Sequence, residues 1–373
     1  MPQAPAYYIG LMSGTSTDGI DGVLADFSRP NQPRTLASAS LPLPPELRQT
    51  LLALNISGPD ELVRSAHASN QLVRQYAQVC AKLLEQTDLD ASQVVAIGAH
   101  GQTVRHDPLA GYTLQLNAPA LLAELSGIDV VADFRTRDVA AGGHGAPLVP
   151  AFHQALFSST YPRTVLNLGG IANITILEPG QPVRGFDTGP ANVLMDLWCQ
   201  LKTSRPYDHK GQWAASGSVN PQLLTLLLED PWFRLPPPKS TGRDLFNQAW
   251  LSTRLSAWHA TNPHQPLADA DIQATLLALT AQTVADAVTT HASRTQELLV
   301  CGGGALNDAL MTALHERLDC PVHATSHVGV PVQDVEALAF AWLAWAYVNN
   351  HPAGQPSVTG ARRATILGCL HKA

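Results

Sequence analysis

The chain has 373 residues, of which 45% are hydrophobic and 14% are charged, and its formal net charge is −7. This length predicts two domains, and this composition excludes an intrinsically disordered chain. The negative balance disfavours nucleic acid and anionic membranes as partners. Five scattered cysteines without a Cys-x-x-Cys pair, and apolar runs well short of the ~20 residues that span a bilayer, favour a cytoplasmic protein with reduced thiols.

The first elements, in residues 7–26, are predicted to be two strands joined by a turn rich in Gly, Ser, Thr and Asp. The glycines permit positive φ and let backbone N–H groups approach an anion, while the hydroxyls add donors. Asp18 and Asp21 suit a Mg²⁺ ion held through water between protein and polyphosphate. An ordinary polar hairpin is the alternative. The residues of the predicted phosphate-binding turn are Gly14, Thr15, Ser16, Thr17, Asp18, Gly19, Ile20 and Asp21.

A strand over residues 35–41, a long amphipathic helix over 62–84 and an apolar strand over 94–101 that ends at a glycine are expected next. His100 and Gln102 lie at the end of that last strand. Because both side chains can exchange hydrogen bonds with hydroxyl groups, we expect them to contact a sugar.

The segment that follows the first half carries Asp133-Phe134-Arg135. A guanidinium can bind a carboxylate through two parallel hydrogen bonds, and an aromatic ring can stack on a sugar. Asp133 and Arg135 are therefore further candidates for substrate binding. A surface salt-bridge cluster is the alternative.

The second half repeats the plan of the first: strands over 164–168, 174–177 and 183–187, a helix near 271–292, and a strand over 297–301. The turn between its first two strands contains Gly169, Gly170 and Asn173, which we expect to grip a polyphosphate opposite the first turn. The repeat is longer here, and we expect an insertion near residues 203–265, which is rich in Pro, Trp and polar residues.

Asp187 lies at the end of the third of these strands, before a helix expected to begin near Pro190. Such a carboxylate suits a general base or a metal partner, although it could instead only cap the helix. A third glycine-rich segment is placed to hold the nucleoside, and it consists of Gly302, Gly303, Gly304 and Asn307. The chain contains neither a Gly-x-x-x-x-Gly-Lys-Ser/Thr phosphate loop nor a Gly-x-Gly-x-x-Gly fingerprint, so another fold must hold any nucleotide.

The last long helix is expected over residues 335–348 and can return to the first domain. The predicted domains are therefore residues 1–132 with about 337–373, and residues 133–336. Glu336, at the start of this helix, is a weaker candidate for a second carboxylate of the site.

Taken together, six segments closely resemble the anhydro-N-acetylmuramic acid kinases, and they match in order over nearly the whole chain. Thr17 stands where Met is common in that family, a change that leaves the carboxylates and glycines of the turn in place. The resemblance implies an α/β fold with two duplicated actin-like ATPase domains, mixed central sheets flanked by helices, and a nucleotide in the interdomain cleft. The segments are Gly10–Asp21, His100–Thr103, Asp133–Arg135, Asn167–Asn173, Phe186–Pro190 and Gly302–Asn307.

The resemblance also implies a reaction in cell-wall recycling. ATP, water and 1,6-anhydro-N-acetylmuramic acid would give N-acetylmuramic acid 6-phosphate and ADP, with Asp187 deprotonating the water that attacks the anomeric carbon. Gly14–Asp21 would hold the phosphates and Mg²⁺, with Gly169, Gly170 and Asn173 opposite, and Gly302–Gly304 would lie near the nucleoside. His100 and Arg135 would contact the sugar.

Two other functions stay open on the residues alone. A non-enzymatic ATP-dependent switch would keep the phosphate turns but would need no small-sugar site, and Asp187 with Asp133 and Arg135 favours the enzyme. A hexose or acyl-acid kinase is the nearer alternative, because the residues do not choose the acceptor. A homodimer is an expectation at the level of the family.

Overall fold

The computed structural model describes residues 5–14 and 17–373, and within them the chain forms two compact units. Unit 1 comprises Met1–Leu156 and Asp334–Ala373, and unit 2 comprises Phe157–Gln333. The chain thus leaves unit 1 and returns to it with its last long helix. The units divide after Leu156, and the predicted division into duplicated domains at 132/133 and 336/337 stays a prediction.

Unit 1 is built on a mixed sheet with the strand order β13-β7-β4-β1-β2-β3 in the described residues. Strand β2 runs antiparallel to both of its neighbours, β1 and β3, whereas β4 and β7 run parallel to β1. The strands of unit 1 are β1 (Tyr7–Met12), β2 (Gly19–Asp26), β3 (Arg34–Pro42), β4 (Val94–Ala99), β5 (Gln102–Asp107), β6 (Tyr112–Leu116), β7 (Val130–Ala132) and β13 (Cys369–His371). Its helices are α1 (Pro45–Ala53), α2 (Glu61–Glu85), η1 (Ala91–Gln93), α3 (Pro119–Ser126), α4 (Thr136–Ala140), α5 (Val149–Phe157, ending at the first residue of unit 2), α12 (Val335–Val348) and α13 (Pro356–Thr359).

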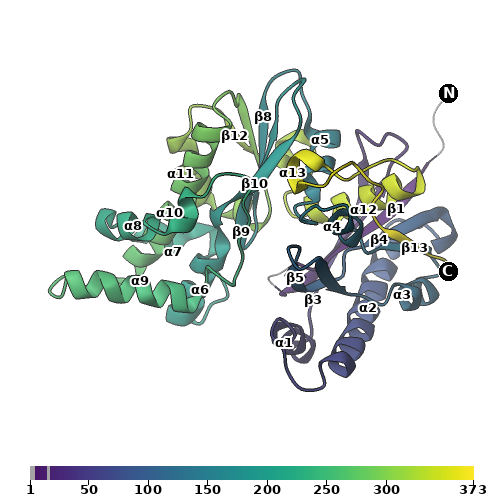
Figure 1. Ribbon diagram of the computed structural model, residues 1–373, viewed down its shortest axis with the longest axis horizontal. Helices are drawn as coiled ribbons and strands as arrows, with labels where there is room; N and C mark the ends of the chain where they lie inside the picture. The colour runs from purple at the N-terminus through teal and green to yellow at the C-terminus, as the bar shows by residue number, and fades with distance from the viewer. Residues whose placement is uncertain (1–4, 15–16) are drawn as a thin grey trace. The chain divides into compact units, whose positions relative to one another are not determined.

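Two helices cover the faces of this sheet. Helix α2 buries Leu72, Tyr76 and Val79, which recur at helical spacing. Helix α12 packs on β1 and β4 (Figure 1), so closely that a Cβ on Gly10 would lie 1.8 Å from the carbonyl oxygen of Ala337. Only glycine fits such an approach, and the strand residues therefore specify where the returning helix docks.

Unit 2 repeats this topology, with the strand order β10-β9-β8-β11-β12 in the described residues. Its first three strands are again antiparallel, and β11 and β12 run parallel to β8. The strands are β8 (Arg163–Leu168), β9 (Ile171–Leu177), β10 (Arg184–Pro190), β11 (Glu297–Cys301) and β12 (Val322–Ala324). The same order and directions in both units confirm the predicted duplication and the mixed sheets flanked by helices.

The helices of unit 2 surround α10, which is buried on nearly all sides and packs on β10, α6, α7, α8 and α11. Residues 203–265, the predicted insertion, are largely helical. The helices are α6 (Asn192–Thr203), η2 (His209–Gly211), α7 (Gln212–Ser216), α8 (Pro221–Leu228), η3 (Pro231–Arg234), α9 (Gln248–Thr261), α10 (Asp269–His291), η4 (Gly303–Leu306), α11 (Asp308–Arg317) and η5 (Thr325–Val328).

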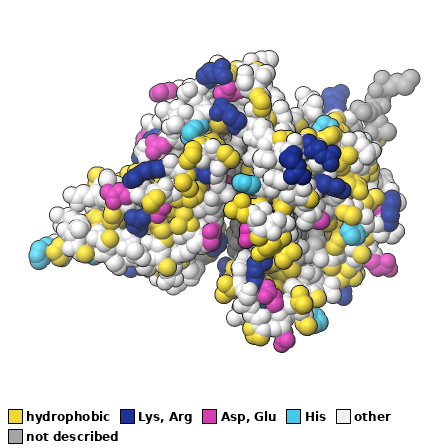
Figure 2. Space-filling model, in the orientation of Figure 1, with side chains coloured by type: hydrophobic (Ala, Val, Ile, Leu, Met, Phe, Trp, Pro, Cys, Tyr) yellow, Lys and Arg dark blue, Asp and Glu magenta, His cyan; other side chains and the backbone are white. Residues whose placement is uncertain are grey.

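Each unit has its own apolar core. The core of unit 1 includes Ile9, Leu24 and Ile97, and that of unit 2 includes Ile174 and Leu298. On the face in view, charged side chains of both signs are mostly scattered among hydrophobic and uncharged ones (Figure 2). No helix in residues 5–14 and 17–373 combines the length and the apolar character needed to cross a bilayer.

Candidate active site

A row of polar side chains crosses the sheet of unit 2 near the end of β8. The strand register places Asn167 opposite Asn173, and Asn173 opposite Asp187. Residues directly opposite one another in neighbouring strands project from the same face, so the three side chains form one row. The predicted residues Asn173 and Asp187 are thus brought together, and Asn167 joins them.

The carboxyl group of Asp187 titrates near neutral pH. Burial raises its pKa to about 7, while the backbone N–H of Thr241 and the charge of Lys239 act in the opposite direction. The Thr241 N–H donates to Oδ2 of Asp187 over 2.9 Å. A carboxylate with such a pKa can accept a proton from water at physiological pH.

The surroundings of Asp187 differ in two details from the sequence expectation. Strand β10 does not end at Asp187 but continues to Pro190, past a bulge between Asp187 and Gly189. Helix α6 begins at Asn192, and its N-cap position is Ala191, which offers no side-chain cap. The interpretation of Asp187 as a helix cap is therefore wrong, because the bulge carries the strand on beyond the carboxylate.

The segment that partners Asp187 was not singled out by the sequence analysis. The N–H of Asp187 donates to the carbonyl oxygen of Lys239 over 3.0 Å. The Lys239 ammonium group donates to the carbonyl oxygen of Phe233 over 2.9 Å and lies 4.3 Å from the ring centre of Trp232. A polar Lys-Ser-Thr run directly after three prolines was the available signal, in a segment more than 50 positions from Asp187.

The glycines of unit 2 that are predicted to bind ATP fall into two groups, according to the space around each of them. A Cβ on Gly302 would lie 2.5 Å from Oδ1 of Asn167, and Gly302 has φ +81°; a Cβ on Gly304 would lie 2.6 Å from Cβ of Leu168. The fold itself therefore requires glycine at both positions. In contrast, a Cβ on Gly169, Gly170 or Gly303 would meet nothing within 3.6 Å in the described structure.

Asn307 has a local structural role. Its side-chain oxygen accepts a hydrogen bond from the N–H of Leu310 over 3.0 Å and caps the N-terminus of α11. Helix α6 is likewise tied to the turn between β8 and β9, because the N–H groups of Asn192 and Val193 donate to the carbonyl oxygens of Gly169 and Gly170.

In unit 1, the turn between β1 and β2 is held by side chains from other elements. The Thr17 N–H donates to the carbonyl oxygen of Gly14 over 3.1 Å. Gln102 donates to the same oxygen over 3.0 Å and accepts a hydrogen bond from the Ser13 hydroxyl. Gln102, predicted to contact a sugar, thus supports the turn. Two residues of the predicted turn lie outside the described residues, Thr15 and Ser16.

The charges of two other carboxylates act on Asp21 beside this turn. The pKa of Asp21 is raised by burial, opposed by a 2.6 Å hydrogen bond from Ser40, and raised further by the charges of Asp18 and Asp334. Burial also raises the pKa of Asp334, which accepts a 2.6 Å hydrogen bond from Ser38. Asp334 was not predicted, because nothing in the sequence connects the start of α12 to the first hairpin.

His100 and Arg135 bind each other. Nε and Nη2 of Arg135 donate to Nε2 of His100 over 3.1 Å and 2.9 Å, and Nη1 donates to the carbonyl oxygen of Gly145 over 2.7 Å. Since a guanidinium has no acceptor, Nε2 of His100 must be the unprotonated nitrogen. Burial, with the charge of Arg135, lowers the pKa of His100 to about 3.

Glu336 and Asp138 act on the charge of Arg135, whereas Asp133 bonds to another residue. Burial lowers the pKa of Arg135 to about 10, and the charges of Glu336 and Asp138 act against that shift. Asp133 does not pair with Arg135 in the hydrogen bonds of the described residues; it has φ +57° and accepts a 2.5 Å bond from Thr136.

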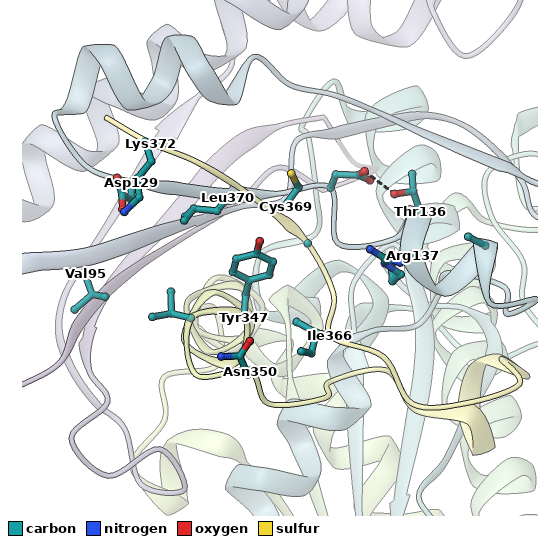
Figure 3. A pocket seen from close by; sticks show the side chains of 14 residues that line it. Val95, Asp129, Thr136, Arg137, Tyr347, Asn350, Ile366, Cys369, Leu370 and Lys372 are labelled. Atoms are coloured by element: carbon teal, nitrogen blue, oxygen red, sulfur yellow. Dashed lines mark hydrogen bonds and ion pairs between the residues drawn. The ribbon is translucent and has the colours of Figure 1, made fainter.

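A pocket of about 850 Å³ opens in unit 1 between β7, β13 and the end of α12. Figure 3 shows Arg137, Tyr347 and Cys369 around it, and Lys372 pairs with Asp129 at 2.5 Å. Asp133 lines this pocket, but the hairpin carboxylates and the polar row of unit 2 do not. Its size alone does not make it the candidate site, because the carboxylates suited to proton transfer or cation binding, such as Asp187 and Asp21, do not line it.

Comparison with known proteins places the chain in a family. The family model for anhydro-N-acetylmuramic acid kinase matches residues 6–373. The chain is 61% identical over 367 residues to an anhydro-N-acetylmuramic acid kinase of Bordetella parapertussis, covering 98% of this chain and 96% of that protein. It is 49% identical over 366 residues to the Chromobacterium violaceum protein of the same name, covering 98% of each.

Solved structures show a more distant likeness. An activator of 2-hydroxyisocaproyl-CoA dehydratase from Clostridium difficile, with bound ADPNP, has a TM-score of 0.45 and 13% identity, covering 92% of this chain and 96% of that one. Scores this low carry no weight beside the full-length sequence matches. On those matches, the chain belongs to the anhydro-N-acetylmuramic acid kinase family.

Proposed function

We propose that the chain is an ATP-dependent kinase that opens the anhydro ring of 1,6-anhydro-N-acetylmuramic acid with water and phosphorylates O6. The products are N-acetylmuramic acid 6-phosphate and ADP. Membership of the family supports the substrate, and the observation that carries the chemistry is the buried carboxyl group of Asp187, with its pKa of about 7.

Asp187 acts as the general base. It takes a proton from water, whose oxygen forms a bond to C1 of the sugar as the bond between C1 and O6 breaks. O6 takes the γ-phosphoryl group of ATP, and ADP leaves. Capture of O6 by phosphorus removes the need for a strong acid at that oxygen.

The neighbours of Asp187 position it. The Thr241 N–H donates to Oδ2 of Asp187 and thereby orients the whole carboxylate. The direction of Oδ1 is set by that orientation. Asn173, beside Asp187 in the row, and Asn167 beyond it can hydrogen-bond to the substrate. Lys239 keeps the pKa of Asp187 from rising further, so that more of the carboxyl group is ionised at neutral pH.

The phosphates are bound by turns in which glycine lets backbone approach the anion. Among the glycines of the predicted ligand-binding turns, Gly169, Gly170 and Gly303 are positions where the described fold leaves room for a side chain, and a close ligand accounts for their identity. Gly302 and Gly304 shape the same loop for the nucleoside, and Asn307 fixes the helix that follows it. In unit 1 the phosphate turn comprises Gly14–Asp21.

The residues beside that turn fit Mg²⁺. Asp18, Asp21 and Asp334 bring negative charge together. Burial raises the pKa of Asp21 most, the charges of Asp18 and Asp334 raise it further, and a divalent cation would relieve that repulsion. Carboxylates and water are the ligands that Mg²⁺ prefers. When bound, the ion neutralises charge on the polyphosphate, and these carboxylates hold it chiefly through water.

The sugar carboxylate is bound by Arg135. His100 accepts two hydrogen bonds from its guanidinium and thereby fixes the plane of that group. Glu336 balances the charge of Arg135, and Gln102 acts on the sugar only through the turn that it supports. Asp133 is the weakest of the proposed contacts, since its carboxylate is bonded to Thr136.

We propose that the reaction takes place in the cytoplasm, where it recovers sugar released from peptidoglycan. The purified chain with ATP, Mg²⁺ and the anhydro sugar should form ADP and the 6-phosphate in equal amounts, as measured by mass spectrometry. Faster turnover of glucose or a small carboxylic acid would instead favour the hexose or acyl-acid kinase. Light scattering tests the expected homodimer.

A further inference from the structure

Two histidines and a glutamate meet at the edge of the sheet in unit 2, away from the polar row. Glu297 begins β11, and two residues later Leu299 pairs with His323 on β12. Because side chains two apart in a strand share a face, Glu297 and His323 project from the same side of the sheet. His327 follows in η5, and its ring stacks on that of His323 with centres 4.3 Å apart and planes at 18°.

One ligand atom from each of these three side chains lies within 4.8 Å of the other two. The ligands of a Zn²⁺ ion bound at about 2.0–2.1 Å lie roughly 3.3 Å apart. Rotation of the exposed His327 side chain can close much of that difference. Two imidazoles and one carboxylate, with a fourth position open to water, are a ligand set that binds Zn²⁺.

The carboxylate of Glu297 is already oriented by neighbours. The Tyr161 hydroxyl and Nε of Arg163 donate to Oε2 over 2.9 Å and 2.8 Å. These two hydrogen bonds hold the carboxylate in one orientation at the start of β11. Residues that hydrogen-bond to a metal ligand hold that ligand in place. Within the described residues both side-chain hydrogen bonds to Glu297 end on Oε2, so neither occupies Oε1.

The types of ligand in the cluster select among metal ions. Nη2 of Arg163 lies 2.6 Å from Oε2 of Glu297 and offsets its negative charge, so the two imidazoles are the distinctive ligands of the cluster. Mg²⁺ and Ca²⁺ require several oxygen ligands, whereas Zn²⁺ and its neighbours in the first transition row bind strongly to imidazole.

We propose that Glu297, His323 and His327 form a binding site for a divalent transition-metal ion, represented by Zn²⁺. The ion ties η5 to the first residue of β11 and so fixes the edge of this sheet. The site is independent of the Mg²⁺ proposed beside the phosphate turn, whose candidate ligands belong to unit 1.

The test is calorimetric titration of the metal-free full-length chain with Zn²⁺, without nucleotide. We expect the unmodified chain to bind Zn²⁺ at one site. In His323→Ala and in His327→Ala the affinity should fall by more than the roughly 10-fold to 100-fold that is typical when a residue hydrogen-bonded to a ligand is removed. His315→Ala is the matched control, because His315 is exposed on α11 of the same unit. Its Zn²⁺ binding should equal that of the unmodified chain.

A spectroscopic readout separates a coordinated ion from loose association. Co²⁺ in the same site should give the intense visible absorption of a four-coordinate ion, and His327→Gln, which keeps a polar exposed side chain, should abolish it. Unchanged Zn²⁺ affinity in both histidine variants would overturn the proposal. So would equal loss in His315→Ala, or no binding by the unmodified chain.

Discussion

The two sheets share one strand order, to which unit 1 adds the edge strand β13, yet their first three strands carry different polar rows. In unit 2 the row is Asn167, Asn173 and Asp187. In unit 1, Asp21 of β2 lies opposite Met12 of β1 and Ser40 of β3. The carboxylate is thus on the third strand of one sheet and on the second strand of the other.

This difference changes what each carboxylate can do. Asp187 is buried beside amide side chains, a backbone N–H and a lysine, so its proton affinity is tuned close to neutral pH. Asp21 is influenced by two further carboxylates, Asp18 and Asp334, an arrangement that favours a cation. One duplicated fold therefore supplies a candidate proton acceptor in unit 2 and a candidate cation site in unit 1.

The largest effect is expected for Asp187→Asn. The amide keeps the shape and can accept from Thr241, but it is not an effective base, so turnover should fall by roughly 10²-fold to 10⁴-fold. Binding of ATP and the sugar, measured by calorimetry, should persist. Near-normal turnover in a folded variant would remove Asp187 from the mechanism.

The same variant should gain stability as its activity is lost. The folded-state pKa of about 7 exceeds the usual 3.8, so the ionised Asp187 costs stability as the pH rises through this range. Thermal unfolding should therefore show a difference between variant and unmodified chain that grows from about pH 4 to pH 7 in favour of the variant. A constant difference would contradict the raised pKa.

Asp21→Asn tests the other half of the comparison. We expect a roughly 10-fold rise in the Mg²⁺ concentration needed for half-maximal turnover, because one carboxylate of the cluster is lost. Asp286→Asn is the control, since its exposed carboxylate accepts a hydrogen bond from Gln282 on α10 and belongs to no proposed site. An unchanged Mg²⁺ requirement in Asp21→Asn would argue against the cation site.

Two alanine substitutions separate ligand contact from folding. Gly303→Ala should raise KM for ATP by about 10-fold with little change in Tm, because the described fold has room for its Cβ. Gly302→Ala should lower Tm by several degrees, because it has positive φ and would press on Asn167. Equal effects of both variants on Tm would remove the distinction.

The smallest effect is expected for Lys239→Gln. The charge of Lys239 lowers the pKa of Asp187, so its removal should move the acidic limb of the pH profile of kcat/KM upward by less than about one unit. A matched change, Lys210→Gln, removes an exposed lysine of the same unit and should leave the profile in place. A shift toward lower pH in Lys239→Gln would contradict the assignment.

Much of the fold was predictable because periodicity is a local property. The hairpin of residues 7–26, the helix near 271–292 and the helix over 335–348 lie where the sequence indicates. Helix α12 can dock on the sheet of unit 1 because Gly10 and Gly98 have no side chains, and the backbone of the helix lies directly against these two positions. The end of β10 was missed because a bulge carries the strand past Asp187.

The candidate site was predictable where its residues adjoin a glycine turn. Asp187 and Asn173 were predicted in this way, whereas Lys239 and Asp334 come from distant segments. Ser38 and Asp334 are joined across 296 positions, and no local pattern reports such a contact. His100 and Arg135 were both predicted, but their mutual binding required the fold.

Turnover in ¹⁸O-labelled water tests the central claim most directly, namely that Asp187 activates water for attack on the sugar while O6 receives the phosphoryl group. Mass spectrometry of the earliest product should find ¹⁸O at C1 and none in the phosphate, with both product formation and labelling suppressed in Asp187→Asn. Label in the phosphate, or an unlabelled C1, would contradict the account.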